Sequence, residues 1–132
     1  MTVNYDAVLG AAVASFVVGG LWYSPLLFGN VYLTLRGLDP TAQSATSAWE
    51  MAGELVRCVV LAIVLAQVLS RSDAFTVGPA VGLAGWFWVG IYATLAGSVL
   101  HEGTPWRLYL LHAGDGFAKL MVSALILARW AR

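Results

Sequence analysis

The sequence is poor in charged residues and in cysteine. Only 11% of its 132 residues are Asp, Glu, Lys or Arg, whereas 60% are hydrophobic. A soluble domain normally carries about a quarter charged residues, so this composition excludes an ordinary water-soluble domain and indicates a membrane protein. The single cysteine, Cys58, lies in an apolar run. A disulfide within the chain is therefore excluded, and we expect Cys58 to be a small buried hydrophobe.

Several chemical signatures are also missing. Seven basic residues balance seven acidic ones, so no basic field favours nucleic acid as a partner. The sequence contains no H-E-x-x-H or C-x-x-C metal motif, no nucleophile elbow and no phosphate-cradling glycine loop. His112 and Asp115 have a spacing that could serve a metal together with His101 or Glu102, but this spacing is common. We therefore predict no metal and no cofactor.

Four long apolar runs predict an all-α integral membrane four-helix bundle that forms one domain over residues 1–132. Each run is close to the roughly 20 residues that a helix needs to cross the hydrocarbon core. Continuous runs of this length satisfy their backbone in lipid as helices. The predicted spans cover residues 5–28, 49–69, 77–100 and 105–130. We expect the first run to be retained rather than cleaved as a signal peptide, because residues 1–6 carry no Lys or Arg.

Capping residues stand at the beginnings of all four runs, and Thr104, followed by Pro105, can cap the fourth. Asn4 can cap the first span, and Thr76 can cap the third. Ser47 and Glu50 form an S-x-x-E capping box for the second span. These residues predict where the helices begin.

The number of spans and the position of the arginines predict how the chain is oriented in the membrane. An even number of spans places both termini and the 70–76 connection on one side of the membrane. That side holds Arg71, Arg129 and Arg132, and the other holds Arg36 and Arg107. The positive-inside rule then favours cytoplasmic termini in the inner membrane of a bacterium.

Rows of small residues, such as Ala11, Ser15 and Gly19, allow close helix packing within the bundle or between the copies of a homo-oligomer.

Two of the spans carry ionisable residues in oily sequence. Glu54 and Arg57 lie in the second span, and His112, Asp115 and Lys119 lie in the fourth. A charge in the bilayer costs about 3 kcal/mol on insertion scales, so such residues need partners and by default mark a functional site. Each set repeats every three or four residues and therefore lies on one helix face.

The two charged stripes are predicted to face each other. Both spans start on the same side of the membrane, and at about 1.5 Å per residue the two sets reach a similar depth, with Lys119 about one turn deeper. We expect cross-pairs such as Arg57 with Asp115, and Glu54 with His112 or Lys119. Trp22 and Tyr23 end the first span in the same half of the membrane, beside Pro25. This half is predicted to hold a polar pocket.

Three hypotheses account for such a pocket. The charges can form a buried ion-pair network that fixes the helix register or joins subunits. They can supply acids and bases to an enzyme whose lipophilic substrate enters from the bilayer. They can also form a relay in a small transporter or proton conductor. A continuous relay is disfavoured, because residues 121–127 offer only Ser123 as a polar group.

The segment Gly20-Leu-Trp-Tyr-Ser-Pro-Leu-Leu-Phe-Gly29 resembles the end of the first helix in an uncharacterised bacterial family of short four-span membrane proteins, a domain of unknown function. The turn Glu102-Gly103-Thr104-Pro105 and the start of the last helix, residues 108–114, are also similar. The resemblance implies the four-helix fold and no assigned activity. Against the family pattern, this chain has added charges at Glu54, Arg57, Asp115 and Lys119, which favours a specialised chemical task.

Our leading hypothesis is acid–base chemistry on a lipophilic small molecule, of the isomerase or cyclase type, driven by protonation. The predicted catalytic residues are Asp115, Glu54 and His112. The predicted substrate-binding residues are Arg57, Lys119, Trp22, Tyr23 and Trp86, of which the cations balance charge and the aromatic rings stabilise developing positive charge. The predicted partners are the lipid bilayer, the lipophilic molecule and further copies of the chain.

Overall fold

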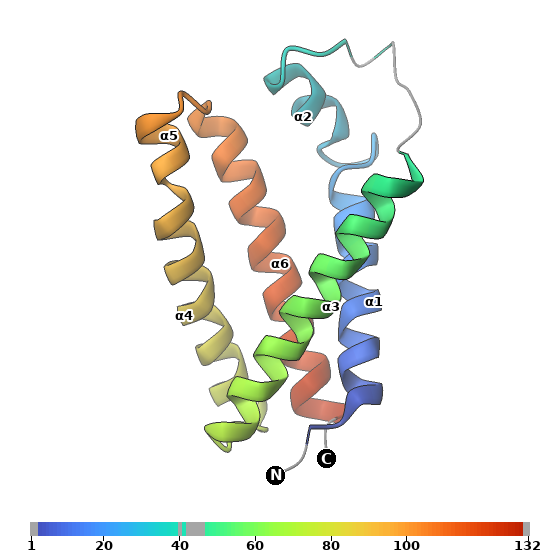
Figure 1. Ribbon diagram of the computed structural model, residues 1–132, viewed down its shortest axis with the longest axis vertical. Helices are drawn as coiled ribbons and strands as arrows, with labels where there is room; N and C mark the ends of the chain where they lie inside the picture. Colours follow the sequence, from blue (N-terminus) through green and yellow to red (C-terminus); the bar gives the residue numbers. More distant parts are fainter. Residues whose placement is uncertain (1–2, 40, 42–46, 131–132) are drawn as a thin grey trace.

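The computed structural model describes residues 3–39, 41 and 47–130, which form a helical bundle (Figure 1). Its helices are α1 (Tyr5–Trp22), α2 (Gly29–Leu35), α3 (Ala48–Arg71), α4 (Val77–Leu95), α5 (Gly97–His101) and α6 (Trp106–Trp130). Four segments are long and apolar enough to cross a membrane, and α4 and α5 together make the third. The predicted fold class, an all-α membrane bundle of four spanning helices, is confirmed.

Helix α6 is the centre of the bundle. It packs along α1 on one side and along α4 on the other, and α1 in turn packs against α3. Helix α3 crosses α1 obliquely and makes few contacts with α6 (Figure 1). The Asn4 side-chain amide donates a hydrogen bond to the Trp130 carbonyl at 3.2 Å. The start of α1 and the end of α6 therefore lie side by side, at the same end of the bundle as the α3–α4 connection (Figure 1).

Small side chains make the contact between α1 and its neighbours close. Ala11 and Ser15, members of the small-residue row predicted on α1, are fully buried. Leu120 and Leu127 of α6 are large, fully buried side chains of the same hydrophobic core as Ala11. Cys58 is buried at 3% exposure and free, as its apolar context predicted.

The predicted caps of α1 and α3 form. Asn4 Oδ1 accepts hydrogen bonds from the backbone N–H groups of Asp6 and Ala7, at 3.0 and 3.3 Å. The Ser47–Glu50 capping box is complete, with hydrogen bonds of 3.1 and 3.2 Å. Thr76 occupies the N-cap position of α4, but its side chain makes no capping hydrogen bond.

The first helix ends at Trp22, before the expected boundary at residue 28. Pro25 lacks a backbone N–H and breaks the helical pattern. The chain then closes a tight turn, in which Phe28 N–H donates to Trp22 O at 2.9 Å and Gly29 N–H donates to Ser24 O at 2.8 Å. A Cβ at residue 29 would lie 2.7 Å from the backbone carbon of Ser24, so the turn requires glycine there. Helix α2 begins at this glycine and was not predicted.

Candidate functional site

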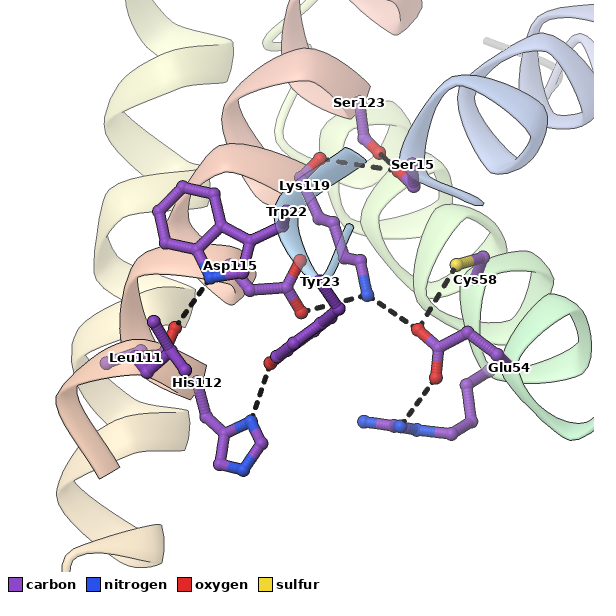
Figure 2. A network of polar contacts seen from close by, with 12 residues as sticks. Ser15, Trp22, Tyr23, Glu54, Cys58, Leu111, His112, Asp115, Lys119 and Ser123 are labelled. Atoms are coloured by element: carbon purple, nitrogen blue, oxygen red, sulfur yellow. Dashed lines mark hydrogen bonds and ion pairs between the residues drawn. The ribbon is translucent and has the colours of Figure 1, made fainter. Parts of the chain in front are cut away.

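The ionisable residues of α3 and α6 meet inside the bundle (Figure 2). Lys119 Nζ lies 2.6 Å from Glu54 Oε1 and 3.0 Å from Asp115 Oδ2. Arg57 Nη1 lies 2.7 Å from Glu54 Oε2. Two cations and two carboxylates thus form one chain of ion pairs, Arg57–Glu54–Lys119–Asp115, which we call the charged network. Its formal charge is zero.

The pairing differs in part from the prediction. The pair between Glu54 and Lys119 forms, because the lysine side chain leans toward the N-terminal end of α6 and reaches back over one turn. Arg57 does not pair with Asp115. It bonds to Glu54 three residues earlier on its own helix, and its side chain is 79% exposed at the edge of the network.

Gly19 of α1 creates the passage that Lys119 uses. A Cβ at this position would lie 2.9 Å from Lys119 Cε and 3.0 Å from Nζ. Since any side chain here would meet the lysine, glycine lets the ammonium cross the surface of α1 and reach α3. The sequence marked Gly19 only as a packing residue, and its role in the network was missed.

One atom of the network has no partner. Asp115 Oδ1 is the buried side-chain oxygen that accepts no hydrogen bond, the only such atom found in the described part of the chain. The Asp115 side chain is 10% exposed, so bulk water does not solvate it freely. Buried acceptors are nearly always satisfied, and each exception needs an explanation. This oxygen can hold a proton, or it can accept one from a bound molecule.

A serine pair marks the inner limit of the polar region. The hydroxyl groups of Ser15 and Ser123 lie 2.8 Å apart, and Ser15 Oγ donates to the Lys119 carbonyl at 3.5 Å (Figure 2). These two serines, Asp115 and Lys119 are the buried polar residues of the described chain. Toward the termini the buried α1 and α6 positions are apolar, among them Ala7.

His112 lies outside the charged network and pairs with Tyr23. The Tyr23 hydroxyl and His112 Nδ1 are 2.6 Å apart. Burial raises the pKa of the Tyr23 phenol, which follows the end of α1, so this hydroxyl keeps its proton. The tautomer of His112 decides which of the two groups donates in this hydrogen bond. The rings of Tyr23 and Tyr32 each lie 5.8 Å from the imidazole ring and cover it.

Three aromatic side chains bond to consecutive carbonyl groups of α6. Trp22 Nε1 donates to Leu111 O at 3.1 Å, Tyr92 OH donates to His112 O at 2.9 Å, and Trp88 Nε1 donates to Ala113 O at 2.8 Å. Glycines at 114 and 116 make room for them, because a Cβ at 114 would lie 2.7 Å from the Trp22 ring and one at 116 would overlap the Tyr92 ring. Trp88 and Tyr92 were not predicted, although the glycines on either side of Asp115 were a signal for close aromatic contact.

The structure does not bring Trp86 to the site. Its side chain is 75% exposed on α4, where it lines a shallow groove with Leu83 and Thr94. Helix α4 turns Trp88 and Tyr92 toward α6 instead. Trp86 was expected to stabilise developing positive charge in the site, but its position inside the span does not reveal which face of the helix meets the bundle.

A larger groove lies between α2 and α6, with a volume of about 720 Å³, and we call it the α2–α6 groove. Its lining includes Trp22, Phe28, Val31, Arg107, Leu110 and Gly114. Trp22 and Gly114 contribute to its wall, and Asp115 directly follows Gly114 on α6. Within the described residues, no group of three or more His, Cys, Asp or Glu side chains could hold a metal ion.

Comparison with known proteins gives a family and no activity. Neither the curated proteins nor the solved structures include a match to this chain. One family model does match, over residues 7–128, which contain the charged network, the Trp22–Gly29 turn and all four spanning segments in large part. The chain therefore belongs to DUF1761, a family described as a protein of unknown function.

Proposed function

We propose that this membrane protein is an acid–base enzyme that acts on a lipophilic small molecule, with Asp115 as the catalytic acid and base. The observation that carries the proposal is the buried, unpartnered Oδ1 atom. General acid–base catalysis requires an oxygen that is free to deliver or accept a proton. The second oxygen, Oδ2, is held by Lys119 at 3.0 Å, which fixes the direction of the carboxyl group.

The α2–α6 groove supplies a place for the substrate. Its volume of about 720 Å³ lies within the range of roughly 300–1,000 Å³ that is usual for small-molecule sites. The groove is mostly apolar, as a site for a lipophilic molecule must be. The Trp22 indole, which donates a hydrogen bond to Leu111 O and packs on Phe28, forms part of its wall. In this proposal the substrate displaces that ring.

The proposed reaction moves one proton and needs no oxidant or reductant. Asp115 donates its proton from Oδ1 to an unsaturated carbon of the substrate, and a carbocation forms. A neighbouring carbon then returns a proton to the Asp115 carboxylate, which regenerates the acid, and an isomer or a cyclised product results. The rings of Trp22 and Tyr23 stabilise the positive charge of the intermediate. Glu54 and Arg57 hold Lys119 and balance its charge.

Deuterium exchange tests the proposal without knowledge of the substrate. The purified protein is incubated in D₂O with a total lipid extract of its host membranes, and the lipids are analysed by mass spectrometry. Wild type should produce a lipid that carries deuterium on carbon. Asp115→Asn should slow this labelling by at least about 100-fold, the usual contribution of a general acid or base. The control Glu102→Gln, exposed outside the network, should label normally. No labelled lipid with wild type, or equal labelling with Asp115→Asn, would contradict the proposal.

A structural role is the second candidate, and one observation favours it. All four charges of the network are paired, and neither Glu54 nor Asp115 lines the α2–α6 groove. The network also ties α3 to α6, which otherwise touch little. An enzyme should tolerate Asp115→Asn as a folded, inactive protein. A scaffold should lose stability in the same variant, and its wild type should give no exchange.

The structure offers less support for a relay. On the terminal side of the Ser15–Ser123 pair, the buried residues that the structure describes are apolar. We further propose that the protein lies in a bacterial inner membrane with cytoplasmic termini, on the basis of the arginine balance of its loops. Arg132, which contributes to that balance, lies outside the described residues.

A further inference from the structure

One end of the α2–α6 groove carries a positive charge that the described chain does not neutralise. Arg107 lies in the first turn of α6 and lines the groove. None of the ion pairs among the described residues includes it, and its guanidinium rests 5.3 Å above the Trp106 ring. The first turn of α6 contains no acidic residue. A helix N-terminus itself carries partial positive charge, so Arg107 and the helix dipole both favour an anion at this end.

Apart from Asn30 and Thr34, the rest of the groove is apolar, and it includes Gly114, the neighbour in sequence of the proposed catalytic residue. Its walls include Phe28, Val31 and Leu110, and its inner wall is formed by Trp22 and Gly114. Arg107 and Gly114 are seven residues apart on one helix, a distance of about 10 Å along its axis. A molecule that fills the groove therefore meets a cation near the membrane surface and an apolar trough below it.

We infer that the groove binds one hydrocarbon chain of an anionic lipid, whose negatively charged headgroup contacts Arg107. This inference rests on the proposed function, because it names the substrate class of the same site. The chain descends along α6 toward Trp22, and the carbons about 10 Å below the headgroup lie closest to Asp115. An unsaturated bond at that distance from the anionic group is the position that Asp115 would protonate.

Lipid binding to purified protein tests the inference. The protein in a neutral detergent is titrated with oleoyl lysophosphatidylglycerol or oleoyl lysophosphatidylcholine, and bound lipid is counted by native mass spectrometry. Wild type should prefer the anionic lipid by roughly fivefold, the usual effect of one arginine near a membrane surface. Arg107→Gln should remove this preference and leave binding of the zwitterionic lipid intact. Val31→Trp should fill the groove and weaken binding of both lipids.

A matched control separates specific binding from general attraction to charge. Arg36 is the C-cap residue of α2, donates to the Tyr32 hydroxyl at 3.1 Å, and does not line the groove. Helix α2 lies at the same end of the bundle as the start of α6 (Figure 1). Arg36→Gln removes the same charge and should keep the preference. Equal loss in Arg36→Gln, or retained preference in Arg107→Gln, overturns the inference. Displacement of the lipid by an equal concentration of inorganic phosphate overturns it as well.

The two proposals fail in different ways. Asp115→Asn should bind the anionic lipid as wild type does, because Asp115 does not line the groove. If wild type gives no deuterium exchange but Arg107 still determines lipid preference, the lipid site stands and catalysis is refuted. If exchange occurs and Arg107→Gln changes neither lipid preference nor labelling, the lipid site is refuted and catalysis stands.

Discussion

Gly19 offers a way to disturb the charged network without removing any charge. A methyl group at this position would lie 2.9 Å from Lys119 Cε and 3.0 Å from Nζ, closer than atoms normally approach. The end of the lysine side chain is flexible, so Gly19→Ala should displace the ammonium rather than the helix. Displacement lengthens the contacts with Glu54 and Asp115, which are 2.6 and 3.0 Å in wild type.

The size of the effect follows from two opposing contributions. Loss of one partner from a buried ion pair costs about 3–5 kcal/mol. A displaced Lys119 ammonium still attracts the two carboxylates at longer distance. We therefore expect about half of this cost, or about 2 kcal/mol of unfolding free energy. Alanine is the better helix former and contributes about 1 kcal/mol in the opposite direction. Gly19→Ala should therefore be about 1 kcal/mol less stable than wild type.

Gly20→Ala is the matched control on the same helix. A Cβ at residue 20 meets nothing within 4 Å, so this variant should gain about 1 kcal/mol from helix propensity alone. The two variants should differ by about 2 kcal/mol in SDS-induced unfolding from mixed micelles. The difference should shrink in a Lys119→Met background, because the ammonium is then absent. If Gly19→Ala and Gly20→Ala are equally stable, the Lys119 side chain does not need the space that Gly19 leaves on the surface of α1.

Two further variants test the surroundings of the network. Ser15→Ala should lower the free energy of unfolding by about 1–3 kcal/mol in the same assay, because it leaves the buried Ser123 hydroxyl without its 2.8 Å partner. The double variant Ser15→Ala/Ser123→Ala should recover part of this loss. If it recovers none, the two hydroxyl groups do not bond directly. Gly29→Ala should lower the free energy of unfolding by about 1–3 kcal/mol in thermal unfolding, because its Cβ would lie 2.7 Å from the backbone carbon of Ser24 in the Trp22–Gly29 turn. Unchanged stability would show that the turn can open.

The sequence determined the spanning helices and the identity of the charged residues. The spans follow from runs of apolar residues long enough to cross lipid, and the Ser47–Glu50 box and Asn4 mark helix starts through bonds between close neighbours in the chain. It also predicted that Glu54 pairs with His112 or Lys119, because depth and a shared face are properties of each helix alone, and the structure has the pair with Lys119.

Only the tertiary structure decided how these charges are partnered. The crossing of α3 over α1 and the gap at Gly19 select Lys119 as the bridge, and they leave Arg57 at the edge. Helix α1 ends at Trp22 because of a turn in which the Phe28 N–H donates to the Trp22 carbonyl, six residues earlier. Trp86 is exposed because the opposite side of α4 packs against α6. The spacing of residues along a helix determines how deep each side chain lies and which side chains share a face. The rotation of each helix about its axis and the angle at which helices cross come from packing against neighbouring helices, and they determine the distances between side chains at the site.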